Sequence, residues 1–280
     1  MIQTLVDMFS NPYLARILVR MMVVGLLVSL CASLLGVSLV LKRYSMIGDG
    51  LSRVGFCSLA IATALHAAPL AVATPVAVLA AFLLLRVSES SKIKGDAAVA
   101  LISTASLAVG VVVISKSTGM NTDVCNYMFG SILVMTDHDM WLSIALCAVV
   151  LVLFVLFYNK IFAVTFDETF ARATGVNTGV YNMLLAFLTA ITVVLGMRMM
   201  GAMLISSLVI FPALTSMRVC KRFITVTVCS AAMSVLCFLL GVLVSSVYEV
   251  PTGASVVLMN VAAFLLFWLA HLIKGRRAIA

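Results

Sequence analysis

The segment 46–55, MIGDGLSRVG, places a carboxylate and a guanidinium between two long apolar stretches of the sequence. Asp49 and Arg53 are four residues apart, so on a continuous helix their side chains share one face. A carboxylate can ligate a cation, whereas a guanidinium keeps its proton and has no lone pair, so Arg53 cannot be a metal ligand. Because ionisable groups inside membrane helices usually face a polar pathway, we expect Asp49 to mark one. The neighbouring Gly48 and Gly50 also fit an interruption of the helix, where backbone carbonyls could assist an ion.

Two further places carry groups that could admit a cation from outside. The segment MTDHDM (135–140) groups Asp137, His138 and Asp139, which are ligand types for a hard or borderline cation. Adjacent residues of a helix point in different directions, which favours the solvated start of a loop for this segment. His66, at the end of a short apolar stretch, is the other candidate for metal entry; an interfacial histidine hydrated by water is the alternative.

The segment FDETFARATGVNT (166–178) has the pattern of a short capped helix. Asp167 and Glu168 lead it, Arg172 lies near its end and Gly175 follows, which is the order that helix caps and the helix dipole favour. A short helix on the cytoplasmic face would offer a surface to a soluble partner. An ordinary amphipathic loop is the alternative.

The composition places the chain among membrane proteins. Hydrophobic residues make up 64% of its 280 residues, charged residues make up 10%, and the mean hydropathy is +1.24, which excludes the soluble globular classes. The formal net charge of +8 resides in short basic clusters between apolar stretches, as in cytoplasmic loops. Since no basic face with interleaved aromatic residues accompanies this charge, nucleic acid is not expected as a partner.

A membrane-spanning helix needs about 20 apolar residues. Stretches of this kind predict spanning helices at 17–41, 97–115, 139–159, 180–197, 201–217, 223–247 and 254–272. Residues 54–85 are too long for one span and contain prolines, which predicts two shorter helices near 51–66 and 70–86. The whole chain, 1–280, is therefore expected to be a single all-α, polytopic domain with eight or nine transmembrane helices in the lipid bilayer.

Basic clusters set the expected orientation. The three basic residues after position 273 place the C-terminus in the cytoplasm. Counting helices back from there puts three segments inside: 86–96, 160–179 and 218–222. It puts two segments outside: 116–138 and 245–253. Nine crossings would leave the N-terminus outside, and eight would leave it inside.

Over nearly its whole length the chain resembles the membrane permease of bacterial ATP-binding-cassette importers for zinc, manganese and iron. The resemblance rests on six segments that follow one another in the order of that family: LVLKRYSMIGDGLSRVG, SKIKGDAAVALISTASLAVGVVVIS, FGSILVMTDHDMWL, FDETFARATGV, GAMLISSLVIFPALTSMRV and YEVPTGASVVL. Each segment alone is a weak signal, whereas six in the same order over 220 residues, 39–258, are a strong one. The first segment is similar to a signature in which a Gly-Asp pair precedes a Ser-His-Ala.

The resemblance implies a dimeric permease fold in the bacterial cytoplasmic (inner) membrane and a transport subunit that is not an enzyme. Its partners would be a separate ABC ATPase, an extracytoplasmic metal-binding protein, and either a second copy of the chain or a sister permease. A divalent Mn, Zn or Fe ion would be cargo, with no permanently bound cofactor. By the same resemblance, 166–178 is the cytoplasmic coupling helix that fits into the ATPase, through Asp167, Glu168, Phe170, Arg172 and Gly175.

Arg53 departs from the family pattern, which has histidine at this position. Aspartate and histidine from two protomers would offer oxygen and nitrogen ligands suited to manganese, iron or zinc; Asp49 fits that set and Arg53 does not. Three accounts stay open. Asp49 and Arg53 form an ion pair, within a helix or across the dimer, with or without a role in transport. Alternatively, a sister permease supplies the histidines in a heterodimer, or the substrate is a metal chelate or anionic species that arginine attracts.

The chain contains no G-x-x-x-x-G-K-[ST] phosphate loop, so transport driven by ATP would need a separate ATPase. A stand-alone secondary transporter or channel is the first alternative class, and it would act without an ATPase. A non-transporting partner of a true permease is the second, and Arg53 is the residue that raises it.

Overall fold

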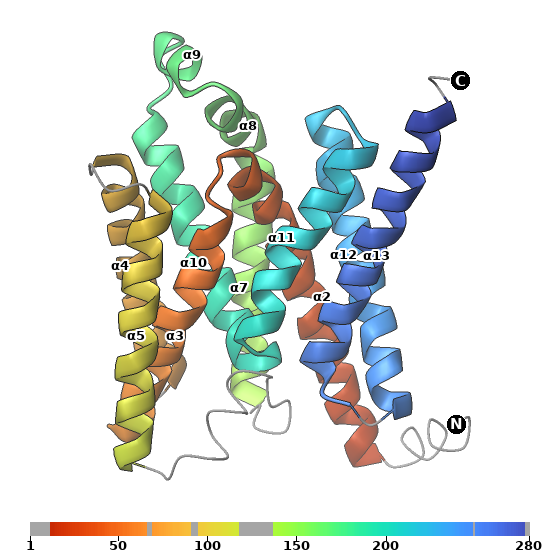
Figure 1. Ribbon diagram of the computed structural model, residues 1–280. Helices are drawn as coiled ribbons and strands as arrows, with labels where there is room; N and C mark the ends of the chain where they lie inside the picture. The colour runs from red at the N-terminus through yellow and green to blue at the C-terminus, as the bar shows by residue number, and fades with distance from the viewer. Residues whose placement is uncertain (1–11, 66–68, 91–94, 118–136, 249, 278–280) are drawn as a thin grey trace.

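The computed structural model describes residues 12–65, 69–90, 95–117, 137–248 and 250–277, and all regular secondary structure in these ranges is helical (Figure 1). The helices in chain order are α2 (Pro12–Leu41), α3 (Ser45–Ala64), α4 (Pro69–Ser90), α5 (Gly95–Ser117), α7 (Asp137–Leu156), α8 (Tyr158–Phe166), α9 (Glu168–Ala173), α10 (Thr178–Met200), α11 (Ala202–Val219), α12 (Phe223–Tyr248) and α13 (Thr252–Arg277). Each apolar segment predicted from the sequence coincides with one of the long helices. The short helices α8 and α9 fall in the segment predicted to be cytoplasmic.

Six of the described helices are long and apolar enough to cross a membrane: α2, α5, α10, α11, α12 and α13. The bent pair of α7 and α8, whose axes differ by 68°, would make a seventh span. Helices α3 and α4 are not among them. Helix α3 carries the charged residues Asp49 and Arg53, and the apolar stretch found in the described part of α4, Val72–Leu83, is shorter than a span. The chain is therefore an all-helical, polytopic membrane protein, but the predicted count of eight or nine crossings is not confirmed by the described residues.

The long helices run side by side and alternate in direction through the bundle (Figure 1). Helices α8 and α9 lie at the end of the bundle where α13 ends, together with the α2–α3 and α11–α12 turns. Helix α2 begins at the opposite end. The end with α9 carries the segments predicted to be cytoplasmic, and we call it the cytoplasmic end. Basic residues whose side chains the structure describes at this end include Lys42, Arg43, Lys160, Arg172, Arg218, Lys221 and Arg222.

Helix α2 is a central element of the bundle and packs against α7, α10, α11 and α12. At Gly36, an added Cβ would lie only 2.1 Å from the carbonyl oxygen of Val209 in α11, so glycine is required for this close approach. Polar contacts also join the central helices, because the Ser234 hydroxyl of α12 donates to the carbonyl of Ser29 at 3.0 Å. The close packing of α2 on α11 in turn places α11 beside α3, where Asp49 lies.

Candidate functional site

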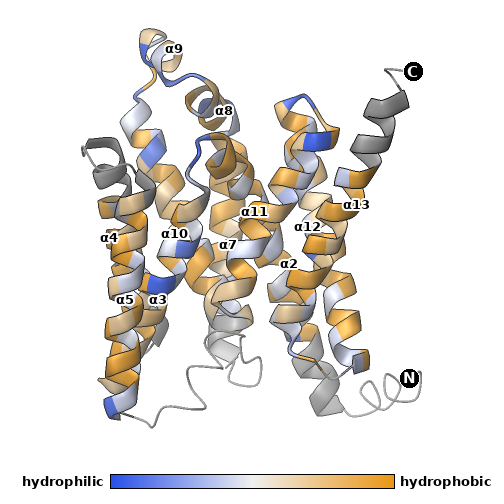
Figure 2. Ribbon diagram, viewed as in Figure 1, coloured by the Kyte–Doolittle hydropathy of each residue, from blue (hydrophilic) through white to orange (hydrophobic). Residues whose placement is uncertain are grey.

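Helix α3 begins at Ser45 and runs without a break, so Gly48, Asp49 and Gly50 are all helical. The helix interruption that the two glycines would also fit is not present in α3. Gly48 instead faces α11, where an added Cβ would be 3.7 Å from the side chain of Val209. Asp49 is four residues past the start of the helix, about 6 Å along its axis at 1.5 Å per residue. Hydrophilic turns mark α3 inside a bundle whose sides are mostly hydrophobic (Figure 2).

Asp49 and Arg53 form an ion pair within α3. Arg53 Nε donates to Asp49 Oδ2 at 3.1 Å. The side chains of Arg53 and Asp49 are 39% and 40% exposed, so the pair is not sealed inside the bundle. The four-residue spacing allowed a pair within one helix or across a dimer, and the structure contains the first. Ion pairs that water reaches contribute about 0–1 kcal/mol, so wherever water reaches this pair both groups stay available to other partners.

The other oxygen of the Asp49 carboxylate faces helix α11. The Ser206 hydroxyl lies 3.5 Å from Asp49 Oδ1 and also donates to the carbonyl of Ala202 at 3.1 Å. Within α3, the Ser52 hydroxyl donates to the backbone carbonyl of Asp49 at 2.7 Å. Ser206 was not among the residues predicted for this site, because only the packing of α11 on α3 brings it there. Its one sequence signal is a small polar residue in an apolar helix.

This arrangement gives a carboxylate with one oxygen on a guanidinium and the other beside a hydroxyl. A cation that binds Asp49 must compete with Arg53, which cannot itself ligate a metal. Among the described residues, no three side chains of His, Cys, Asp or Glu group together as a metal site. Asp49 is therefore not part of a group of three such side chains in the described part of the chain.

The residues predicted for external metal entry remain predictions. His66 lies outside the described residues. Asp137, His138 and Asp139 form the first turn of α7, which corrects the expected loop start. Acidic residues are favourable in the first turn of a helix because the helix dipole is positive there. The side chains of these three residues lie outside the part of the chain that the structure describes.

Helix α9 forms in the segment predicted to hold a short capped helix, and Asp167 is its N-cap. The carboxylate Oδ1 of Asp167 accepts hydrogen bonds from the N–H groups of Thr169 and Phe170, both at 3.0 Å, and from the Thr169 hydroxyl at 2.6 Å. These bonds, led by that of the Thr169 hydroxyl, hold the pKa of the Asp167 carboxyl below its ordinary value. The cap thus fixes where the helix begins.

Gly175 ends α9 as predicted, with a φ of 83° that favours glycine. Its N–H donates to the carbonyl of Arg172 at 3.0 Å, and the N–H of Val176 donates to that of Ala171 at 3.0 Å. These two bonds form a Schellman motif, which satisfies carbonyls left free at the helix end. Caps at both ends give a helix of six residues a defined shape.

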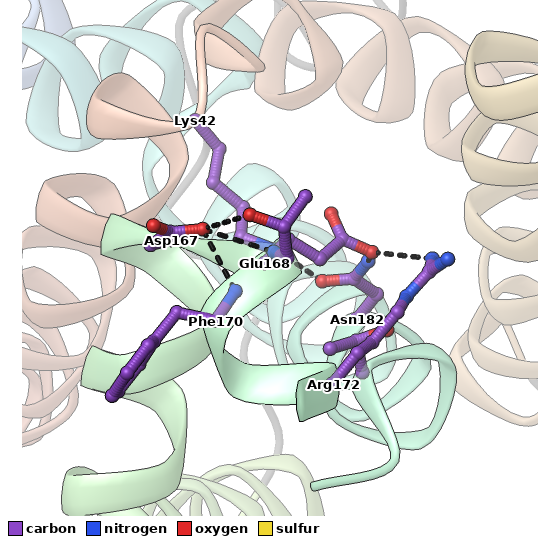
Figure 3. Close-up of polar contacts among 8 residues, drawn as sticks. Lys42, Asp167, Glu168, Phe170, Arg172 and Asn182 are labelled. Atoms are coloured by element: carbon purple, nitrogen blue, oxygen red, sulfur yellow. Dashed lines mark hydrogen bonds and ion pairs between the residues drawn. The ribbon is translucent and has the colours of Figure 1, made fainter. Parts of the chain in front are cut away.

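One face of α9 is buried and another is open. Ala171 is buried against the protein, whereas Phe170 and the preceding Phe166 are both 65% exposed. Arg172 and Glu168 form an ion pair at 3.0 Å on this helix (Figure 3). Large aromatic side chains exposed at the surface of a chain are typical of surfaces that bind another protein. The arrangement can therefore insert an aromatic side chain from a rigid, capped turn into a partner.

Together these features define the class of the protein. It is a multi-pass helical membrane protein with a partly exposed carboxylate, Asp49, in one helix and a capped helix, α9, at its cytoplasmic end. The chain matches the ABC 3 transport family over residues 15–271 and belongs to this family. It is thus a transport component rather than a catalytic enzyme, and a multi-pass protein of the bacterial inner membrane. The resemblance drawn from the six sequence segments is confirmed.

Individual relatives match nearly the whole chain. It is 29% identical over 274 residues to the manganese transport system membrane protein MntC of Halalkalibacterium halodurans, covering 98% of this chain and 91% of that relative. It is 27% identical over 252 residues to the high-affinity zinc uptake system membrane protein ZnuB of Haemophilus influenzae, covering 90% and 96%. Among solved structures, PsaBC from Streptococcus pneumoniae in complex with Fab superposes with a TM-score of 0.84 and 26% identity, covering 96% of this chain and 95% of that chain.

Proposed function

We propose that the chain is the transmembrane permease of an ATP-driven importer. In this proposal it passes a divalent transition-metal ion, manganese, zinc or iron, from an extracytoplasmic binding protein to the cytoplasm. The printed names of MntC and ZnuB, which match nearly the whole chain, support this substrate class. The observation that carries the proposal is the Asp49 carboxylate, which is 40% exposed on a helix of a mostly hydrophobic bundle. A carboxylate kept accessible in such a place favours a cation route.

The route would pass Asp49, with Ser206 beside it and Arg53 as the cation that the metal displaces. The missing ligands would come from water and from a second permease, because the described residues of one chain offer too few. A homodimer would supply a second Asp49, whereas a sister permease could supply histidine. In either assembly we propose nine crossings, with α3 and α4 as short spans. The start of α2 and the end of α13 at opposite ends of the bundle support an odd number (Figure 1).

At the cytoplasmic end, α9 would dock on a separate ABC ATPase. Phe170 would insert into the ATPase, Glu168 and Arg172 would orient the helix, and the caps at Asp167 and Gly175 would hold its shape. The 65% exposure of Phe170 and the two completed caps support this assignment. The helix would then carry the movement that follows ATP binding into the membrane domain.

Reconstitution tests the proposal. The full chain would be placed in proteoliposomes with its ATPase and a metal-loaded binding protein, and uptake of Mn²⁺, Zn²⁺ and Fe²⁺ would be measured with and without ATP. We expect ATP-dependent uptake of at least one of these ions. Uptake without the ATPase would instead indicate a secondary transporter or channel. Uptake only when a second, histidine-bearing permease is added would establish the heterodimer, and uptake only of a chelated metal would establish the chelate account.

A further inference from the structure

Helix α9 is tied to the first turns of α10 by two polar contacts (Figure 3). The Glu168 carboxylate accepts from Arg172 Nη2 at 3.0 Å and from Asn182 Nδ2 at 3.4 Å through the same oxygen, Oε1. Arg172 Nε in turn donates to the Thr178 hydroxyl at 2.8 Å. Because Asn182 and Thr178 both belong to α10, a displacement of α9 acts directly on the start of that helix.

The same asparagine continues the contact to a third element. Asn182 is only 2% exposed, and its Oδ1 accepts a hydrogen bond from Lys42 Nζ (Figure 3). An amide has both an acceptor and two donors, so it can bridge an ammonium group on one side and a carboxylate on the other. A hydrocarbon side chain of similar size could do neither, so this buried position depends on the amide. The result is a continuous polar chain from Glu168 through Asn182 to Lys42.

Lys42 lies in the turn that leads directly into the helix of the proposed metal route. The turn is held to the end of α2, since the N–H of Lys42 donates to the carbonyl of Ser38 at 3.1 Å and that of Tyr44 to the carbonyl of Leu39 at 2.8 Å. Helix α3 begins one residue after Tyr44, and Asp49 comes seven residues after Lys42. A helix moves as a rigid element, so a shift of this turn shifts the Asp49 carboxylate with it.

We infer that Lys42 and Asn182 are positioning residues that pass the movement of α9 to Asp49. The inference rests on the proposed function, because it needs α9 to dock on an ATPase and Asp49 to meet the metal. When docking displaces α9, its Glu168 displaces Asn182 through their hydrogen bond. Asn182 in turn displaces Lys42 through the next hydrogen bond, and Lys42 lies just before the start of α3. The inference is drawn from a contiguous set of hydrogen bonds between three elements, and chains of hydrogen bonds are one kind of network that can carry coupling between distant sites.

The test separates this role from simple anchoring of α9. Lys42→Met and Asn182→Leu would each be assembled with the ATPase and binding protein in proteoliposomes, and the number of metal ions imported per ATP hydrolysed would be measured for whichever of Mn²⁺, Zn²⁺ and Fe²⁺ the wild type imports. We expect this ratio to fall about tenfold, the size of a 1.4 kcal/mol coupling, while ATP hydrolysis and affinity for the ATPase stay within twofold. The double variant should be no worse than the worse single variant, because both changes cut one chain of contacts.

Two matched variants complete the experiment. Lys42→Arg keeps a charged donor and should retain most of the coupling, while Lys160→Met removes an exposed lysine of α8 at the same end of the bundle and should leave the ratio unchanged. An unchanged ratio in Lys42→Met and Asn182→Leu, or a fall that only follows loss of ATPase binding, would overturn the inference alone. Absence of ATP-dependent import by the wild type would overturn the proposed function, and this inference with it.

Discussion

Replacing Arg53 by glutamine tests whether the guanidinium competes with a cation for Asp49. In the structure Arg53 Nε holds Asp49 Oδ2 at 3.1 Å, and both side chains are about two-fifths exposed. A metal ion that ligates this carboxylate through Oδ2 must first break the contact. Glutamine keeps much of the length of the side chain but removes its charge, so the carboxylate becomes free to bind the ion.

The magnitude follows from the exposure of the pair. A cation route past Asp49 would bring water to the pair, and ion pairs in contact with water at this helical spacing contribute about 0.2–1 kcal/mol, which corresponds to a change of about 1.4- to 5-fold in an equilibrium constant. We therefore expect Arg53→Gln to lower the dissociation constant for Mn²⁺ by about this factor. Removing a positive charge beside a divalent ion acts in the same direction. The free energy of unfolding should change by less than about 1 kcal/mol, because the pair contributes no more than that.

Equilibrium binding of Mn²⁺ to the purified permease–ATPase complex, without the binding protein, measures this constant from the loss of the free-ion electron paramagnetic resonance signal. Lys116→Gln is the matched control, since it removes one positive charge from the exposed last turn of α5 and should leave binding unchanged. An unchanged dissociation constant in Arg53→Gln would refute the competition. Lost uptake of a chelated metal or an anionic substrate by an intact complex would instead show that the guanidinium itself holds the cargo.

Three further predictions concern packing, capping and docking. Gly36→Ala should destabilise the protein by about 1–3 kcal/mol because the added Cβ meets a backbone carbonyl of α11. Gly179→Ala should not, because a Cβ added there would be 3.6 Å from the side chain of Asn177. Thermal denaturation in detergent compares the two variants. The pKa of Asp167 is held below its ordinary value of 3.8, so its cap should be complete at and above pH 3.8 and be lost as the pH falls through the lower pKa of the folded state. Hydrogen exchange of the Thr169 and Phe170 amides should therefore show protection that falls with the pH in the wild type but not in Asp167→Asn. An equal loss of protection in both proteins would contradict the cap. Phe170→Ala should weaken binding of the ATPase at least tenfold without unfolding the permease, as a pull-down and a denaturation midpoint would show, and unaltered binding would remove Phe170 from the interface.

Much of the fold follows from the sequence because each helix is a local apolar stretch between polar turns. The ends of α9 were also predictable, since Asp167 and Gly175 act on their own neighbouring residues. The start of α3 was harder to predict. The glycines around Asp49 also fit a broken helix, whereas the structure has a continuous helix with Gly48 packed near Val209. The number of spans is also hard to predict, because Asp49 and Arg53, the charged residues of the candidate site, lower the hydropathy of α3.

The contacts that assemble the site could not be predicted from local patterns. Ser206 and Asp49 are 157 positions apart, and Lys42 and Asn182 are 140 apart. Their meeting depends on which helices pack together, and single apolar stretches carry little information on this. The choice between a pair within α3 and a pair across a dimer was likewise open at a spacing of four residues, because that spacing places both groups on one face whether or not they turn toward each other.

Asp49→Asn in the reconstituted importer shows whether the metal passes Asp49. The amide has nearly the same shape as the carboxylate but no negative charge to attract a cation. We expect this variant to lose ATP-driven metal uptake while its complex with the ATPase still assembles and hydrolyses ATP. Uptake at the wild-type rate by this variant would contradict this expectation.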